Sequence, residues 1–182
     1  GEGDKDAQRE AAAWYRKSAE QGHLAAARRL GIALEGGRGI DPAPAEAIAW
    51  LGMGPEAGDT VVDFGAAPGG WTRVLLERRA RVIAIDPAEL DPKIARMRGV
   101  RHVRASAFGF EPEAPIDWLV CDMAWRPLEV AELIAKWGRR RWARALIATI
   151  KLPMKRKLEL LSRVKKTIEA GGWQNLRMRH LY

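Results

Sequence analysis

The sequence predicts an α/β fold with a doubly wound, mostly parallel sheet, preceded by an α-helical segment. Two observations carry this prediction. From Asp59 onward, short unbroken apolar runs alternate with amphipathic helical stretches, whereas residues 1–52 are rich in alanine and show no strand pattern. Unbroken apolar runs are typical of parallel strands buried on both faces, and their alternation with helices predicts right-handed crossover connections. We therefore expect a helical segment at 1–52 and a sheet domain at 53–182.

The helical segment contains an internal echo. Glu10–Trp14 returns as Glu46–Trp50, an offset of 36 residues that is typical of helical-hairpin repeats. The expected helices lie near 6–21, 24–35 and 43–51.

Four short motifs in this stretch match a known class of helical repeat. They are Trp14–Lys17, Ala19–His23, Leu30–Gly31 and Gly37–Ile40. On these residues, the stretch 10–51 resembles the SEL-like branch of the tetratricopeptide-type repeats. The resemblance implies a surface that binds a protein partner, and the alternative is an amphipathic helical cap without one.

The sheet domain divides into strands and helices in alternation. The candidate strands are, in order, Thr60–Phe64, Val82–Asp86, Val100–Ala105, Trp118–Cys121, Ala145–Ile150 and a last one near Gln174–Arg179. The candidate helices are Gly70–Arg79, Pro127–Arg140 and Met154–Ala170. Pro127 suits the first turn of its helix, and Gly171 with Gly172 suits the end of the last one. Ligands of such sheets bind beyond the carboxyl ends of the strands, where the strand order reverses.

A glycine-rich turn follows the first strand and leads into a helix. Glycine lets the backbone approach a ligand closely, and the first turn of a helix offers free N–H groups to an anion. The spacing D-x-G-x-x-P-G-G-W is more restrictive than the G-x-G-x-x-G of dinucleotide sites and favours S-adenosyl-L-methionine. The alternative is a turn with a structural role alone. The predicted cofactor-binding residues here are Asp63, Gly65, Ala66, Pro68, Gly69, Gly70 and Trp71.

Acidic residues end two further strands. Asp86 follows the second strand, where a carboxylate can accept the ribose hydroxyls of an adenosine; otherwise it is a turn or cap residue. Asp122 follows the fourth strand, beside the expected methyl donor, and is also predicted to bind the cofactor. Lys151 follows the fifth strand at the same edge. A lysine directly after a buried strand is costly unless paired, and Asp122 is its natural partner. The pair is either catalytic, with Lys151 as a base of lowered pKa, or a structural ion pair.

Charge is distributed unevenly along the chain. Residues 125–182 hold 15 of the 31 Lys and Arg residues but 4 of the 23 Asp and Glu residues, a net charge of +11. Clustered cations attract phosphate backbones, although a solvated basic helix surface has the same composition. Trp125, Trp137 and Trp142 could stack on bases if they are exposed, whereas Trp71 and Trp118 are expected in the core.

The bulk composition excludes several classes of protein. A chain of 182 residues suits one domain with a small appendage, and the single Cys121 excludes an internal disulfide. The sequence shows no apolar run of the roughly 20 residues that cross a bilayer and no signal peptide, so we expect a cytoplasmic protein. The three histidines are scattered, so no metal site is predicted.

Several motifs of residues 58–182 together match one family of enzymes. They are the turn Asp63–Thr72, the run Trp118–Met123 with Arg126-Pro127, the segment Lys151–Lys155 and the closing His180–Tyr182. On these residues the domain resembles the Rossmann-like FtsJ-type ribose 2′-O-methyltransferases, and within them the RlmM family, which methylates a cytidine ribose of large-subunit ribosomal RNA. The resemblance implies a Lys-Asp-Lys-Glu tetrad in which Asp122 is the aspartate and Lys151 the second lysine. Lys151 would then orient or deprotonate the 2′-hydroxyl.

The chain departs from this family at several positions. Ala43 falls near the position of the first tetrad lysine, and the final glutamate belongs to a closing hairpin beyond Tyr182, so we expect a C-terminally truncated sheet edge. Ser106 stands where the family often places an acid that binds the adenine amine, and a hydroxyl can still accept that hydrogen bond. Two alternatives stay open. One is a catalytically impaired scaffold that binds S-adenosyl-L-methionine or a protein, and the other is a methyltransferase for proteins or small molecules.

Overall fold

The structure is a computed structural model of the 182-residue chain. It describes residues 2–21, 26, 29–31, 33–34, 54–153 and 157–176. The chain forms two compact units, one of Gly1–Gly54 with Met178–Tyr182 and one of Pro55–Arg177. Among the described residues, no helix combines the length and the hydropathy needed to cross a membrane.

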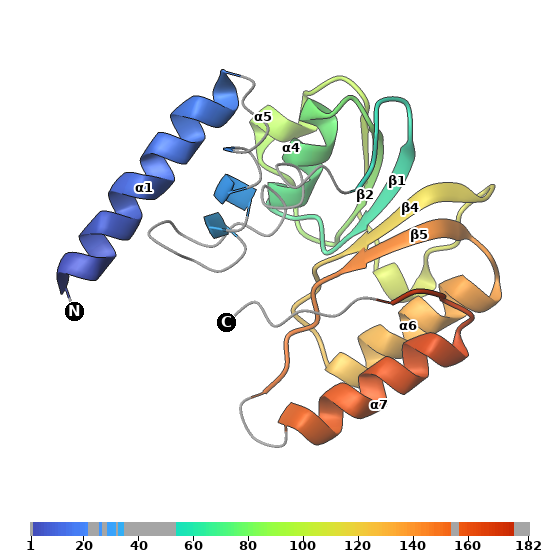
Figure 1. The fold of residues 1–182 in the computed structure, drawn as a ribbon. Helices are drawn as coiled ribbons and strands as arrows, with labels where there is room; N and C mark the ends of the chain where they lie inside the picture. Colours follow the sequence, from blue (N-terminus) through green and yellow to red (C-terminus); the bar gives the residue numbers. More distant parts are fainter. Residues whose placement is uncertain are drawn as a thin grey trace. The chain divides into compact units, whose positions relative to one another are not determined.

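The first unit contains helix α1, Glu2–Glu20, drawn in blue in Figure 1. The sequence placed this helix near 6–21, and it begins four residues earlier. Tyr15 and Ala19 of α1 pack in a small apolar cluster with Leu30 and Leu34. The described residues within the expected helix 24–35 are helical, and the expected helix at 43–51 lies outside the described residues.

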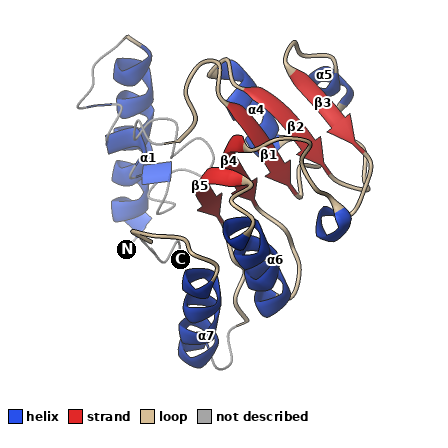
Figure 2. Cartoon of the chain, turned by 90° about the vertical axis from the view of Figure 1, so that its right-hand side faces the viewer, coloured by secondary structure: helices blue, strands red, loops and turns tan. Residues whose placement is uncertain are grey.

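The second unit is built on a five-stranded parallel sheet of order β3-β2-β1-β4-β5 (Figure 2). Its strands are β1 Thr60–Phe64, β2 Arg81–Ile85, β3 Val100–Val103, β4 Ile116–Cys121 and β5 Ala143–Ala148. The order reverses between β1 and β4, so the switch point lies where the sequence analysis expects ligands. The doubly wound α/β fold is confirmed. Every strand pair described is parallel, and β5 forms one edge.

Helices cover both faces of this sheet (Figure 1). They are α4 Gly70–Glu77, α5 Pro92–Ala95, the 3-10 turn η1 Ala107–Gly109, α6 Pro127–Arg139 and α7 Lys157–Ala170. Adjacent strand residues point to opposite faces. Asp63 bonds to Thr72 of α4 and Phe64 packs on Trp137 of α6, so α4 and α6 cover opposite faces. Helix α7 lies beside α6.

Three short elements and several boundaries differ from the sequence prediction, and one of the three, η1, was not expected at all. Helix α5 was not expected, although Asp91 followed by Pro92 is an N-cap signal, and the Asp91 side chain accepts a hydrogen bond from the N–H of Lys93 at 2.7 Å. The strand expected near Gln174–Arg179 is not formed at residues 174–176, and 177–179 lie outside the described residues. The last helix is described from Lys157 onward.

The main core contains an aromatic cluster between β1 and α6. The rings of Phe64 and Trp137 meet edge to face with centroids 5.1 Å apart, and Trp142 meets Trp137 at 5.5 Å. Trp137 is completely buried, so the exposure that base stacking would require is absent at this residue. Trp71 is buried as expected, whereas Trp118 is half-buried and donates its indole N–H to Asp59 at 3.0 Å.

Two glycines let the end of α7 approach α6 closely. A Cβ added to Gly171 would lie 2.5 Å from the Cα of Ala135, and a Cβ on Gly138 would lie 2.6 Å from the indole nitrogen of Trp173. That nitrogen donates to the carbonyl of Ile134 at 2.9 Å. No room is left for a side chain at either position.

Replacing Gly171 by alanine is expected to lower the free energy of unfolding by about 1–3 kcal/mol, because overpacked backbone must move apart. Denaturant unfolding measures the change. Gly109→Ala is the matched control, since a Cβ there meets nothing within 4 Å. Equal stability of the two variants would contradict the close approach.

Candidate functional site

The turn after β1 is pressed against the end of β4. Gly65 has φ +75, and a Cβ there would lie 3.1 Å from the Cα of Met123 and 3.2 Å from the carbonyl oxygen of Asp122. The N–H of Asp122 donates to the carbonyl of Phe64 at 3.0 Å. Only glycine adopts this conformation without strain at so close a contact, so Gly65 places the turn beside the fourth strand.

The far side of the turn rests on α5. Gly69 has φ +123, and a Cβ there would lie 2.5 Å from Cδ1 of Ile94. The N–H of Asp91 donates to the carbonyl of Pro68 at 2.8 Å. Gly69 is also the N-cap of α4, which has no side-chain cap and no acidic residue in its first turn. Its N–H groups and positive dipole end therefore suit an anion such as a carboxylate.

Asp63 is completely buried beneath this turn. One carboxylate oxygen, Oδ2, accepts a hydrogen bond from the Thr72 hydroxyl at 2.6 Å, and Oδ1 has no hydrogen-bond partner. Burial raises the pKa of Asp63 to about 7; the Thr72 hydrogen bonds oppose the shift, and the charges of Asp122 and Asp86 add to it. A buried carboxylate oxygen without a partner is unfavourable and fits a ligand that brings a positive group.

The raised pKa of Asp63 predicts a pH-dependent stability. The folded state holds this proton more tightly than the unfolded chain, so stability falls as pH rises between 3.8 and about 7. The rise of the Asp63 pKa from 3.8 to about 7 corresponds to roughly 4 kcal/mol of stability, which is lost in full above the folded pKa. In Asp63→Asn this loss is expected to disappear. Urea unfolding at pH 4 and pH 8 checks it, and identical pH profiles for the two proteins would contradict it.

Asp86 holds the glycine turn to β2. Its Oδ2 accepts the N–H of Ala67 at 3.1 Å, and its Oδ1 accepts the N–H of Ala88 at 2.8 Å. Each oxygen keeps a further lone pair that can accept a hydrogen bond from a hydroxyl. Both interpretations of Asp86 from the sequence, ribose binding and a turn or cap role, therefore stay open. Ser106 is exposed and caps η1, accepting the N–H of Phe108 at 3.4 Å.

The other predicted residues of the turn differ in exposure. Ala66 and Trp71 are buried, so they support the turn from beneath, whereas Pro68 and Gly70 are exposed. Thr72 was not expected in the site. Its position directly after the G-G-W motif, in the first turn of α4, is the signal that identifies it in hindsight.

Asp122 and Lys151 meet at the carboxyl ends of β4 and β5. The Lys151 ammonium lies 3.5 Å from Oδ1 of Asp122, and the side chains are 52% and 29% exposed. That Oδ1 is itself buried and has no hydrogen-bond partner, so the ammonium is the group that balances its charge. The Lys151 side chain is half exposed, so the expectation that it is buried is wrong. Its amine is therefore open to a substrate from solvent.

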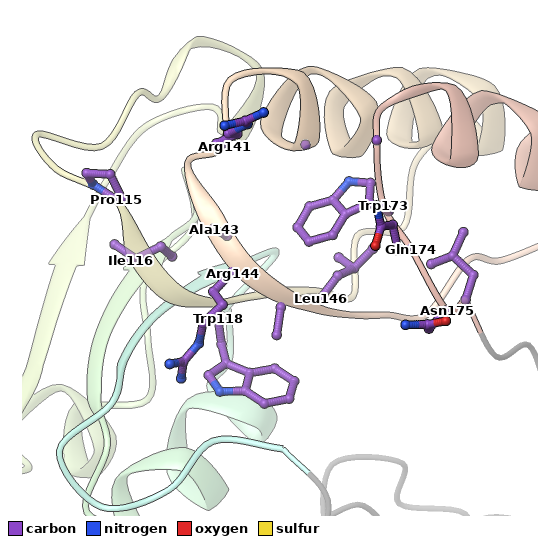
Figure 3. Close-up of a pocket in the computed structure, with 14 residues that line it drawn as sticks. Pro115, Ile116, Trp118, Arg141, Ala143, Arg144, Leu146, Trp173, Gln174 and Asn175 are labelled. Carbon is purple, nitrogen blue, oxygen red and sulfur yellow. The ribbon is translucent and has the colours of Figure 1, made fainter.

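A separate cavity of about 730 Å³ lies along the start of β5 (Figure 3). Arg144 and Trp118 border it on one side, and Trp173 with Gln174 on the other. Neither Asp63, Asp122 nor Lys151 lines it. The cavity is therefore distinct from the site at the switch point.

Comparison with known proteins identifies a family for most of the second unit. The family model described as FtsJ-like methyltransferase matches residues 49–147. The chain is 47% identical over 118 residues to ribosomal RNA large subunit methyltransferase M of Halorhodospira halophila, covering 65% of this chain and 35% of that protein. The proteins of the same name from Marinomonas sp. and Thauera aminoaromatica are 42% and 41% identical over 130 residues, covering 69% of this chain and 37% and 36% of theirs. The chain thus spans about a third of the length of these relatives.

One solved structure shares the fold at low sequence identity. It is a putative O-methyltransferase from Nostoc punctiforme, with a TM-score of 0.53 and 12% identity, covering 82% of this chain and 55% of that one. At this identity the likeness concerns the fold alone.

Proposed function

Because the chain belongs to the FtsJ-like methyltransferase family, we propose that it is an S-adenosyl-L-methionine-dependent RNA ribose 2′-O-methyltransferase acting on large-subunit ribosomal RNA. One observation carries the proposal. The Lys151 amine lies 3.5 Å from the Asp122 carboxylate, directly beside the glycine turn that Gly65 presses against Asp122. A hydroxyl becomes a nucleophile when positioned groups orient it and take up its proton. An amine and a carboxylate beside the turn assigned to the cofactor are groups of this kind.

The residues present fit the cofactor. The uncapped N-terminus of α4 suits its carboxylate, and the unpaired Oδ1 of Asp63 suits a cationic group. Asp86 is the residue we propose for the ribose hydroxyls, and Ser106 is the one we propose for the adenine. When bound, the cofactor supplies a methyl group already activated on a sulfonium.

Lys151 and Asp122 then act on the substrate hydroxyl. We assign to Lys151 the binding and orientation of the ribose 2′-hydroxyl. It takes up the hydroxyl proton as the oxygen attacks only in its neutral amine form, after the ammonium has released a proton to solvent. Asp122 holds the lysine in place and balances its charge at 3.5 Å. Since the donor is activated, much of the rate comes from positioning the hydroxyl in line with the methyl group.

The RNA partner is supported by the basic segment after residue 125. The run Arg139–Arg141 at the end of α6 is exposed, and so are Lys165 and Lys166 on α7. Exposed cations on neighbouring helices suit a phosphate backbone. A ribosomal RNA substrate also supports a cytoplasmic place of action.

For the first unit, we propose a SEL-like helical repeat that contacts a protein partner. The packing of Tyr15 and Ala19 of α1 against Leu30 and Leu34 supports a helical hairpin. Ala43, near the position of the first tetrad lysine, lies outside the described residues.

Methyl transfer to RNA tests the proposal. The chain is incubated with tritiated S-adenosyl-L-methionine and a large-subunit ribosomal RNA transcript, and the RNA is then hydrolysed in alkali. A 2′-O-methyl group blocks cleavage at its own phosphodiester, so label in alkali-resistant dinucleotides is the expected result. Cofactor binding in calorimetry without any methyl transfer would favour the scaffold alternative. The observation behind that alternative is Ala43, which stands near the position of the first tetrad lysine. Label on protein or base would overturn the ribose assignment.

A further inference from the structure

An exposed aromatic side chain stands next to the reactive pair. Trp125 lies in the loop between β4 and α6, three residues after Asp122, so its Cα lies within about 11 Å of that residue. Trp125 is 53% exposed, and the other large apolar residues exposed in the described part of the chain are Trp14 and Leu158. An exposed tryptophan face beside a site that acts on RNA is suited to stack on a base.

The indole is held in place rather than free. Its N–H donates to Oε2 of Glu129 at 2.7 Å, and its ring lies against Phe108 with centroids 5.8 Å apart and planes tilted by 54°. Phe108 belongs to η1, which follows β3. Contacts from two different segments therefore fix the ring before any ligand binds, which lowers the entropy lost on binding.

Glu129 also fixes the neighbouring cation. Its Oε1 accepts from the guanidinium of Arg126 at 2.9 Å, while the Arg126 side chain stays 82% exposed. The hydrogen bonds that Glu129 accepts lower its pKa. The one from Arg126 contributes most, followed by the one from Trp125. One carboxylate thus sets an aromatic face and a positive charge side by side, as recognition of a base and its phosphate requires.

We propose that Trp125 stacks on an unpaired base of the RNA substrate next to the methylated ribose, that Arg126 binds an adjacent phosphate, and that Glu129 positions both. The proposal rests on the proposed function and extends it: the substrate is single-stranded at the target. Sequence-tolerant stacking on an aromatic face needs an unstacked base, which a paired helix does not offer.

Binding of a fluorescent single-stranded RNA 12-mer to the full chain, followed by anisotropy, tests the proposal. Trp125→Ala is expected to weaken binding about 10- to 100-fold, the loss typical of one stacked base, and Trp125→Phe to restore most of it. Arg126→Ala is expected to lower the slope of log Kd against log salt by about 0.7. Glu129→Ala, which frees both side chains, is expected to weaken binding less than Trp125→Ala, and Glu129→Gln is expected to recover part of the loss.

Trp14→Ala is the matched control, since Trp14 is 63% exposed and has Lys17 over its ring at 5.8 Å, but belongs to the other unit. It is expected to bind the RNA like the parent.

Calorimetry with S-adenosyl-L-methionine is run on each variant. Unchanged RNA binding by Trp125→Ala, or an equal loss in Trp14→Ala, overturns the proposal. A loss of cofactor affinity confined to Trp125→Ala also overturns it, because the ring then covers the cofactor. Failure of the parent to bind the cofactor counts against the proposed function instead. The RNA-binding measurement still decides whether Trp125 stacks on a base.

Discussion

Lys151→Ala is expected to lower the rate of methyl transfer to RNA by about 10²- to 10⁴-fold, the usual contribution of a positioned acid–base group. Its amine, 3.5 Å from Asp122 and half exposed, is the group we assign to the 2′-hydroxyl. Cofactor affinity is expected to stay within about threefold, because methyl-donor binding is assigned to the glycine turn and Asp63. Single-turnover transfer of tritiated methyl and calorimetry measure the two quantities separately.

Two further variants make this result specific. Lys165→Ala removes another exposed lysine that pairs with a carboxylate, Glu169 at 3.6 Å, and is expected to keep the parent's chemical step under saturating RNA. Lys151→Arg keeps the positive charge, but arginine does not release its proton in proteins. Transfer close to that of the parent in Lys151→Arg would assign an orienting role, and a loss as deep as in Lys151→Ala would assign proton uptake. Full activity of Lys151→Ala would exclude the assigned chemistry.

Gly65→Ala is expected to weaken S-adenosyl-L-methionine binding by at least about 100-fold and to lower the free energy of unfolding by about 1–3 kcal/mol. The added Cβ would meet the Cα of Met123 at 3.1 Å and the carbonyl oxygen of Asp122 at 3.2 Å. These are backbone atoms that cannot rotate away, so the turn itself must shift from the end of β4. Calorimetry and thermal unfolding measure both effects.

Gly99→Ala separates backbone strain from displacement of the turn. Gly99 has φ +94, but a Cβ there would make ordinary contacts, at 3.4 Å from Ala80 and 3.5 Å from Leu76. This variant is expected to lose stability by a similar backbone effect while keeping the cofactor affinity of the parent. Equal cofactor binding by Gly65→Ala and the parent would show that the turn does not cradle the ligand.

The strand and helix pattern was predicted well because it depends on local periodicity. All five strands of the described sheet were expected within a few residues, and so was the helix after the glycine turn. The joint edge of Asp122 and Lys151 was also expected, because parallel neighbouring strands end on the same side. Helix α5, of four residues, has too short a pattern to stand out, although its Ile94 supports the turn.

The exposure of individual side chains was predicted less well. Trp137 was considered for base stacking and is completely buried, whereas Trp125, two residues before the start of α6, is exposed. Lys151 was expected to be buried and is half exposed. Burial depends on which elements pack together across the sheet, and that information is not contained in the neighbours along the chain.

By itself, the sequence determined the alternation of strands and helices, the glycine turn and the residue types that gather at the carboxyl edge. Only the tertiary structure decided that Asp63 is buried beneath the turn with one oxygen unpaired, and that Glu129 holds Trp125 beside Arg126. The physical reason is range. Periodicity and turn chemistry act over a few consecutive residues, whereas desolvation and hydrogen-bond pairing depend on groups that the fold brings together from distant parts of the chain.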